Sequence, residues 1–376
     1  MAKAKDFFLN VERSVTGRAW VDRLDAQAAR MAGAITQQTG LSEIQARIVA
    51  ARGIVAEEAE SYLNPAIRDL MPDPSTLTDM DALADRLARA IAKGESIALF
   101  GDYDVDGATS CALMTRYLRA FGLEADVHIP DRIFEGYGPN VAAMDKLIDG
   151  GATLIMTLDC GTTSEEPIVH AKARGADVIV IDHHLAEHDL PPATALVNPN
   201  RADDVSGLGY LSAAGVTFMA MVATNRVLRG QGLKVPDLMA MLDLVALSTV
   251  CDVVPLKGLN RAFVTRGIEI MRRGSNAGIS ALALVARVTG PLNPYHLGFV
   301  IGPRINAGGR IGDSALGARL LAGDDEYDAM AIAAQLNELN TERQRIEIEA
   351  VEAAAAAADA EIGSGEGPPV LVLASE

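Results

Sequence analysis

The fold is decided by the stretch IALFGDYDVDG, which spans residues 97–107. Its first four residues are apolar and predict a buried strand, which a glycine then ends. Three aspartates, Asp102, Asp104 and Asp106, follow at every second position. Because alternate side chains of an extended chain point to the same side, we expect the three carboxylates to converge. Carboxylates that close repel one another unless a cation lies between them, so the stretch predicts a divalent metal site.

The sequence around this stretch alternates apolar strands with helices. Strands are expected over 97–100, 125–129, 153–158 and 177–181, and helices over 80–93, 108–121, 141–149 and 165–174. Such alternation predicts right-handed crossovers and a doubly wound parallel sheet of the α/β class. Ligands of such sheets bind beyond the carboxyl ends of the strands.

Two further strands of this predicted sheet also end in residues that bind metals. The strand over 153–158 is followed by Asp159, and the strand over 177–181 is followed by Asp182, His183 and His184. We expect these side chains to gather with the first aspartates at one edge of the sheet. Asp252 lies in an otherwise apolar run, where a carboxylate is costly to bury unless it is paired or bound to a metal.

The chain after residue 207 is expected to be mostly helical. The stretch GPRINAGGRIG (302–312) combines glycines, which permit close backbone approach, with the hydrogen-bond donors of two arginines and an asparagine. It predicts an anion-binding loop. Residues 324–362 predict one long helix, favoured by helical apolar spacing and by the alanine run over 353–358. The apolar residues 370–373 resemble the start of a strand.

Composition limits the classes of function and the setting. A formal net charge of −17 argues mildly against a nonspecific nucleic-acid binder, although bound cations would cancel part of it. The three cysteines show no CxxC spacing, which favours a reduced, cytoplasmic setting. We find no signal peptide and no apolar run that would span a bilayer, so no membrane partner is expected.

Together these motifs resemble the DHH superfamily of phosphoesterases, which is named for the triplet that stands here as Asp182-His183-His184. The other matching motifs are residues 101–107, 131–132, 136–138, 159–161, 198–200, 251–256 and 302–312. Within the superfamily the chain is similar to the single-strand-specific exonucleases of the RecJ family, chiefly through residues 302–312. The resemblance covers nearly the whole chain, but RecJ proteins continue into a second, glycine-rich domain and an OB-fold.

The resemblance implies a centre that holds two divalent cations, Mn²⁺ or Mg²⁺. Their ligands would be Asp104, Asp106, Asp159, His183 and Asp252. Asp182 and His184 would belong to the catalytic centre, where they orient His183 or contact phosphate. Asp102 would support the ligands or stabilise the loop.

The resemblance also implies how substrate is held. Arg304, Asn306 and Arg310 would bind backbone phosphates near the metals. Arg132 and Tyr137 would contact phosphate and stack on a base, because proteins that bind single strands commonly stack bases on aromatic rings.

The implied activity is hydrolysis of single-stranded DNA in the 5′-to-3′ direction, in DNA repair and recombination. A helicase or a single-strand-binding protein would be the partner. Two alternatives stay open: a nano-RNase or cyclic-dinucleotide phosphodiesterase of the same superfamily, and a catalytically weak scaffold protein.

The expected parts of the chain follow from this resemblance. They are a helical or capping region over 1–76, a DHH catalytic domain with a helical part over 77–323, a connecting helix over 324–362, and a linker with the first strand of a missing second (DHHA1-like) domain over 363–376.

Overall fold

The structure is a computed structural model that describes residues 7–186, 189–363 and 367–374. The chain divides into two compact units, Met1–Leu70 with Lys257–Ala262, and Met71–Leu256 with Phe263–Glu376. The described part of the first unit contains a short 3₁₀ turn and four helices: η1 (Phe8–Asn10), α1 (Ala26–Thr39), α2 (Glu43–Ala50), α3 (Ala56–Leu63) and α4 (Ile67–Leu70). Ile35, Val49 and Ala59 contribute to its small apolar core.

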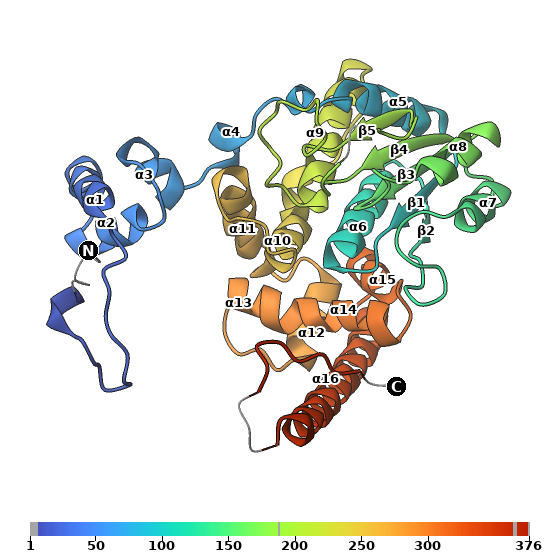
Figure 1. Cartoon of the computed structure of the whole chain (residues 1–376). Coiled ribbons are helices and arrows are strands. Elements are labelled where there is room, and N and C mark those ends of the chain that lie inside the picture. The colour runs from blue at the N-terminus through green and yellow to red at the C-terminus, as the bar shows by residue number, and fades with distance from the viewer. Residues whose placement is uncertain (1–6, 187–188, 364–366, 375–376) are drawn as a thin grey trace. The chain divides into compact units, whose positions relative to one another are not determined.

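The second unit is built on a parallel sheet with the strand order β2-β1-β3-β4-β5 (Figure 1). The strands are β1 (Ile97–Gly101), β2 (Asp126–His128), β3 (Leu154–Leu158), β4 (Asp177–Ile181) and β5 (Ala195–Val197). Every residue of β1 and β3 is buried, because helices cover both faces of the sheet. Burial on both faces explains why these strands are continuous apolar runs in the sequence.

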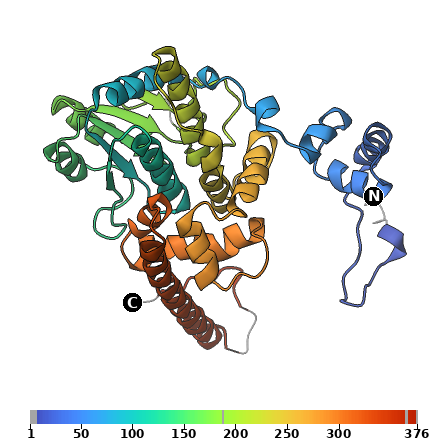
Figure 2. The ribbon, with the colours of Figure 1, turned by 180° about the vertical axis from the view of Figure 1, so that it is seen from behind.

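Helices form a layer on each side of this sheet. On one face, Phe100, Ile155 and Val180 belong to an apolar cluster with Met144 of α7 (Val141–Asp149) and Ile168 of α8 (Glu165–Ala173). On the other, α5 (Met80–Lys93), α6 (Val105–Arg119) and α9 (Ala213–Gly230) pack together and against the strands. Figure 2 shows the same layers from behind. The predicted doubly wound α/β fold is therefore confirmed; β5 is an additional strand that was not predicted.

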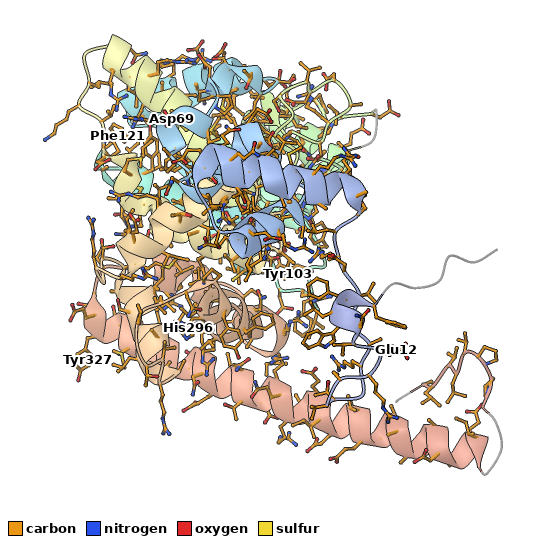
Figure 3. All side chains as sticks on the ribbon, turned by 90° about the vertical axis from the view of Figure 1, so that its left-hand side faces the viewer. Glu12, Asp69, Tyr103, Phe121, His296 and Tyr327 are labelled. Atoms are coloured by element: carbon orange, nitrogen blue, oxygen red, sulfur yellow. The ribbon has the colours of Figure 1, made fainter. Side chains whose placement is uncertain are left out.

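The remaining helices lie in the second unit, apart from the residues within Lys257–Ala262, which belong to the first unit. They are η2 (Pro74–Thr76), η3 (Leu238–Met241), α10 (Leu242–Cys251), α11 (Gly258–Met271), α12 (Ala277–Val285), α13 (Pro294–His296), the π-helical turn η4 (Leu297–Ile301), α14 (Gly302–Ile311), α15 (Leu316–Ala322) and α16 (Glu326–Ile362). The first turns of α16 bury Ala329, Ala333 and Leu336, and the helix packs against α12, α14 and α15. Figure 3 shows α16 as one continuous rod, as the sequence predicts. No helix within the described ranges is both long and apolar enough to cross a membrane.

Residues 302–311 form the helix α14, so the prediction of a glycine-rich loop is wrong. Pro303 stands in the first turn, where its fixed φ favours a helix and its missing N–H has no intrahelical partner to lose. The glycines serve close packing. A Cβ atom at Gly309 would lie 2.5 Å from the backbone oxygen of Tyr103, so only glycine lets α14 approach the Asp102–Asp104 segment.

The C-terminal segment also differs from its prediction. Residues 370–373 form no strand with the described part of the chain. The physical reason is that a strand is defined by hydrogen bonds to a neighbouring strand, and none lies beside this segment there. Residues 364–366 of the predicted linker, and the last two residues, lie outside the described residues.

Asp243 is a buried carboxylate in the first turn of α10. It is 3% exposed, and it accepts a hydrogen bond from the backbone N–H of Leu244 at 2.9 Å. Burial raises the pKa of Asp243 to about 6, opposed by the hydrogen bond from Leu244 and by the Arg116 guanidinium. Because the folded state then holds a proton more tightly than the unfolded state, ionisation of Asp243 destabilises the fold.

We expect Asp243→Asn to remove this destabilisation. The contribution of Asp243 is most favourable below pH 4 and is lost as the pH rises to about 6 and above. The unfolding free energy of the variant, relative to the wild type, should therefore rise by about 2–3 kcal/mol between pH 4 and pH 7. Urea unfolding at both pH values measures the difference, with Asp85→Asn on the exposed face of α5 as the control. A difference that does not depend on pH would contradict the prediction.

We expect Gly309→Ala to destabilise the second unit by about 1–3 kcal/mol, because the added methyl group would overlap the backbone of Tyr103. Gly230→Ala is the matched control, since a Cβ atom there meets no atom within 4 Å and alanine favours helix. Thermal unfolding of both variants measures the effect. Equal stability of the two would show that α14 does not need its close approach to Tyr103.

Candidate metal centre

Four polar side chains form a row along the carboxyl edge of the sheet. Asp102, Asp159, Asp182 and Asn198 each directly follow a strand: β1, β3, β4 and β5, respectively. The register pairs the last residues of these strands with one another. The row also continues the sheet's hydrogen bonds, since the backbone N–H groups of Asp102, Asp159 and Asp182 each donate to the last residue of the next strand. The predicted meeting of strand ends is therefore present.

Asp104 and Asp106 also lie at the carboxyl edge of the sheet, but the backbone conformation that places them there differs from the prediction. The chain does not stay extended after β1; instead Asp104 caps α6, and its Oδ1 accepts from the N–H groups of Asp106 and Gly107 at 2.8 and 3.1 Å. Asp106 stands in the first turn of that helix. The expectation of alternating side chains on an extended segment is therefore wrong. An aspartate at the N-cap is the local signal for this helix start.

Asp106 is held by three hydrogen bonds from α9 and α10. It is 1% exposed and accepts hydrogen bonds from Ala213 N–H (2.6 Å), Ala214 N–H (2.8 Å) and the Ser248 hydroxyl (2.6 Å). The two amides belong to the first turn of α9, whose positive end favours an anion. Burial raises the pKa of Asp106, and these hydrogen bonds oppose that rise. Ser248 has a positioning role that the sequence did not reveal.

His183 faces three carboxylates. Its Nε2 lies 3.3 Å from Asp159 Oδ1, 3.6 Å from Asp106 Oδ2 and 3.7 Å from Asp252 Oδ2. Its Nδ1 lies 3.0 Å from the carbonyl oxygen of Leu211, which can only accept, so Nδ1 carries the proton. In the neutral ring, the lone pair of Nε2 then points at carboxylate oxygens. That arrangement is repulsive without a cation, and it is the usual way a metal-binding histidine is oriented.

The donor set fits divalent cations. Asp159 Oδ1 and Asp252 Oδ2 are buried and accept no hydrogen bond. Within the described residues, ligand atoms lie within 4.8 Å of one another in three groups: Asp159-His183-His184, Asp106-His183-Asp252 and Asp102-Asp104-Asp159. Oxygen-rich sets with imidazole suit Mn²⁺ or Mg²⁺. The third group places Asp102 alongside the other candidate ligands.

The crowding of carboxylates raises the affinity of the centre for protons. Burial, followed by the charge of Asp104, raises the pKa of Asp102 to about 7. Burial, followed by the charge of Asp106, raises the pKa of Asp252 to about 7. Both shifts reflect first the burial of a carboxylate and then the charge of a neighbouring one, and a bound cation would oppose both effects.

Asp182 is enclosed by hydrogen-bond donors. Its Oδ1 accepts from His183 N–H, His184 N–H and His184 Nδ1, and its Oδ2 accepts from Thr162 N–H. Burial alone would raise the pKa of Asp182, but the bonds from His184 and Thr162 outweigh burial and lower it. Through these contacts Asp182 fixes the backbone and ring of the two histidines. The hydrogen bond from Asp182 raises the pKa of His184 to about 9.

Two asparagines after β5 complete this support. Asn198 is fully buried and donates to the Thr162 hydroxyl and to the His184 carbonyl, both at 2.9 Å. Asn200 donates to the carbonyl oxygens of His183 and Gly209. The motif over 198–200 was visible in the sequence. Its role in holding the two histidines was not, because the contacts join segments that no local pattern relates.

A cavity of about 230 Å³ opens beside the carboxylates and is lined by Asp102, Tyr103, Asp104, Arg132, Asn306 and Arg310. The guanidinium of Arg132 lies over the Tyr103 ring, 5.2 Å from its centroid. Tyr137 meets Tyr103 edge-on, with ring centroids 6.4 Å apart, and its hydroxyl lies 3.5 Å from His184 Nε2. Arginines and carboxylates thus face one another across a space that adjoins the metal centre.

Arg304 is the predicted substrate residue that the structure places elsewhere. It does not line this cavity; its guanidinium donates to Asn337 of α16 and to the carbonyl oxygen of Val300. Burial lowers the pKa of Arg304. These contacts use two of the five N–H donors of the guanidinium, and they support a role in joining α14 to α16.

Comparison with known proteins agrees with this geometry. Residues 96–249 match the model of the DHH family, N-terminal domain. A crystal structure of exonuclease RecJ bound to manganese is 33% identical, with a TM-score of 0.69, and the match covers 78% of this chain and 72% of that one. The chain belongs to the DHH family.

Other members of the DHH family are similar over most of this chain. The single-stranded-DNA-specific exonuclease RecJ of Escherichia coli is 38% identical over 310 residues, which is 80% of this chain and 53% of that protein. RecJ of Thermus thermophilus in complex with Mn²⁺ has a TM-score of 0.74 at 30% identity, with 89% of this chain and 47% of that one covered. The chain spans about half the length of the curated relatives it matches.

We expect Mn²⁺ to raise the melting temperature of the wild type, because a cation bound only by the folded state stabilises it by about 2.7 kcal/mol at one hundred times its Kd. Asp159→Asn should melt at or above the wild-type temperature without metal, because burial and the neighbouring carboxylates make ionisation of Asp159 costly and asparagine carries no charge. It should gain little from Mn²⁺. Calorimetric scans with and without Mn²⁺ test both effects, and an equal gain in both proteins would contradict the ligand assignment.

Proposed function

We propose that this chain hydrolyses phosphodiester bonds of single-stranded DNA as a metal-dependent exonuclease of the RecJ type. The observation that carries the proposal is the cavity in which Arg132, Asn306 and Arg310 face Asp102 and Asp104, beside buried carboxylate oxygens that accept no hydrogen bond. Cationic donors bind a phosphate, and its metal-dependent hydrolysis also requires a nearby divalent cation. The names of the similar proteins, single-stranded-DNA-specific exonucleases, support the same substrate.

Two divalent cations would be held by Asp104, Asp106, Asp159, His183 and Asp252, with Asp102 as a further candidate ligand. Similar solved proteins are complexes with Mn²⁺ or with Mg²⁺. When bound, such cations supply hydroxide at neutral pH and neutralise charge on the phosphoryl oxygens. The protein holds the ligand side chains in place. The N-terminus of α9 and Ser248 bind the Asp106 carboxylate, and the Leu211 carbonyl orients the His183 ring.

The cationic and polar side chains of the cavity would orient the scissile phosphate. Arg132 and Arg310 can donate to its non-bridging oxygens, and the side-chain NH₂ group of Asn306, which also lines the cavity, can donate as well. Asp182 fixes His184, whose Nε2 stands beside the Tyr137 hydroxyl. We assign His184 and Tyr137 to contact with phosphate.

Preference for a single strand would come from aromatic contacts. Tyr103 and Tyr137 stand next to the cavity, and an unpaired base can stack on such rings. The 5′-to-3′ direction, a role in repair and recombination, and a helicase or single-strand-binding partner are proposed from the RecJ resemblance. The three free cysteines support a reduced, cytoplasmic setting.

The test is hydrolysis of a 5′-labelled single strand in Mn²⁺ by the wild type and by Asp106→Ala. We expect the variant to lose roughly 100-fold or more in rate, because it removes a ligand and empties the hydrogen-bonding site at the start of α9. A chelator should abolish wild-type activity. Asp85→Asn is the control for surface charge, and equal rates for Asp106→Ala and the wild type would refute the metal assignment.

The same assay separates the alternatives. Cleavage of dinucleotides but not of long strands would favour a nano-RNase or cyclic-dinucleotide phosphodiesterase. Failure to bind Mn²⁺ in calorimetry, together with no hydrolysis, would favour a scaffold protein.

A further inference from the structure

The loop between β2 and α7, whose path Figure 1 shows, carries two adjacent large apolar residues that are exposed to solvent. Ile133 is 76% exposed and Phe134 is 87% exposed. Single exposed apolar residues are common on protein surfaces and carry no meaning alone. Two further features indicate a role for this pair in substrate binding. They are the hydrogen bonds that hold the loop and the residues on either side of the pair.

The turn that carries the pair is fixed by carboxylates. Asp131 Oδ1 accepts from the N–H groups of Ile133 and Phe134 at 2.8 and 3.1 Å. Glu135 accepts from Asp131 N–H at 3.1 Å, and its other oxygen lies 2.9 Å from Nε2 of His128. His128 belongs to β2, so these contacts tie the turn to the sheet. The backbone donors at the tip are satisfied internally, and the apolar side chains are left facing solvent.

The same turn carries two residues of the site. Arg132 immediately precedes the pair, lines the cavity and lies over the Tyr103 ring. Tyr137 follows three residues after Phe134 and approaches His184. Along the chain, Ile133 and Phe134 therefore lie between a residue that lines the cavity and one that approaches His184, on a loop whose shape is set by hydrogen bonds.

We propose that Ile133 and Phe134 form an apolar platform that receives an unpaired nucleobase of the single strand next to the cleaved bond. The inference rests on the proposed function and specifies it: Arg132 would bind phosphate while the platform binds the base. An aromatic face accepts any base, and stacking does not depend on the protein's charge, which is −17 overall. Paired bases of a duplex are already stacked, so the platform discriminates in favour of single strands.

The test compares Phe134→Ala and Phe134→Trp with the wild type under single-turnover conditions in Mn²⁺. The substrates are an all-base oligonucleotide and a set in which one abasic nucleotide is moved stepwise from the cleaved end. We expect Phe134→Ala to lose about 5- to 100-fold in kcat/KM on the all-base strand, and the loss to shrink at one abasic position. Phe134→Trp should retain activity and quench 2-aminopurine placed at that position.

Two controls separate base contact from folding. Hydrolysis of bis(p-nitrophenyl) phosphate, which has no base, should be unchanged in Phe134→Ala. Tyr327→Ala removes another exposed aromatic ring, 90% exposed on α16 and far from Tyr103 in Figure 3, and should leave strand cleavage unchanged.

The possible outcomes are distinct. A wild type that cleaves no strand refutes the proposed function and the platform with it. A wild type that cleaves while Phe134→Ala equals it refutes the platform alone and would make the turn a candidate protein-docking site. A loss that is the same at every abasic position also overturns base contact.

Discussion

The carboxylate of Asp106, buried against the first turn of α9, is the contact on which the metal centre depends. Two backbone N–H groups and the Ser248 hydroxyl bind its oxygens, so a charge that would be costly in the interior is stabilised in one orientation. That orientation leaves Oδ2 facing His183. The contact also joins α6, α9 and α10. The packing of these three helices therefore sets the position of the Asp106 carboxylate in the metal centre.

The edge of the parallel sheet supplies the other half of the centre. The neighbouring strands β1, β3, β4 and β5 are paired in register. They are followed by Asp102, Asp159, Asp182 and Asn198, respectively, and the strand spacing brings these side chains together. Their uses then diverge according to their partners. The carboxylate of Asp182 accepts four hydrogen bonds and holds the two histidines in place. Asp159, by contrast, has a buried carboxylate oxygen that accepts no hydrogen bond. Two aspartates at equivalent strand ends thus differ in role: Asp182 supports the histidines, whereas Asp159 is a candidate metal ligand.

Much of this arrangement was predictable because it follows from local periodicity. The apolar runs of β1, β3 and β4, the alternation with helices and the acidic strand ends all appear in order along the chain. The predictions failed where a helix cap or packing decided the outcome. Asp104 caps α6, so the helix begins within the aspartate stretch that was expected to be extended. The glycines over 302–312 belong to a packed helix, in which Gly309 lies against the backbone of Tyr103.

The sequence by itself determined the fold class and which residue types meet at the carboxyl edge of the sheet, since the alternation of strands with helices and the acidic residues that follow the strands can be read along the chain. Only the tertiary structure decided what each of those residues does. The link from Ser248 to Asp106, the support of His184 by Asn198 and the attachment of Arg304 to α16 join positions 142, 14 and 33 residues apart. No local pattern encodes such contacts, because they depend on how whole helices and strands pack.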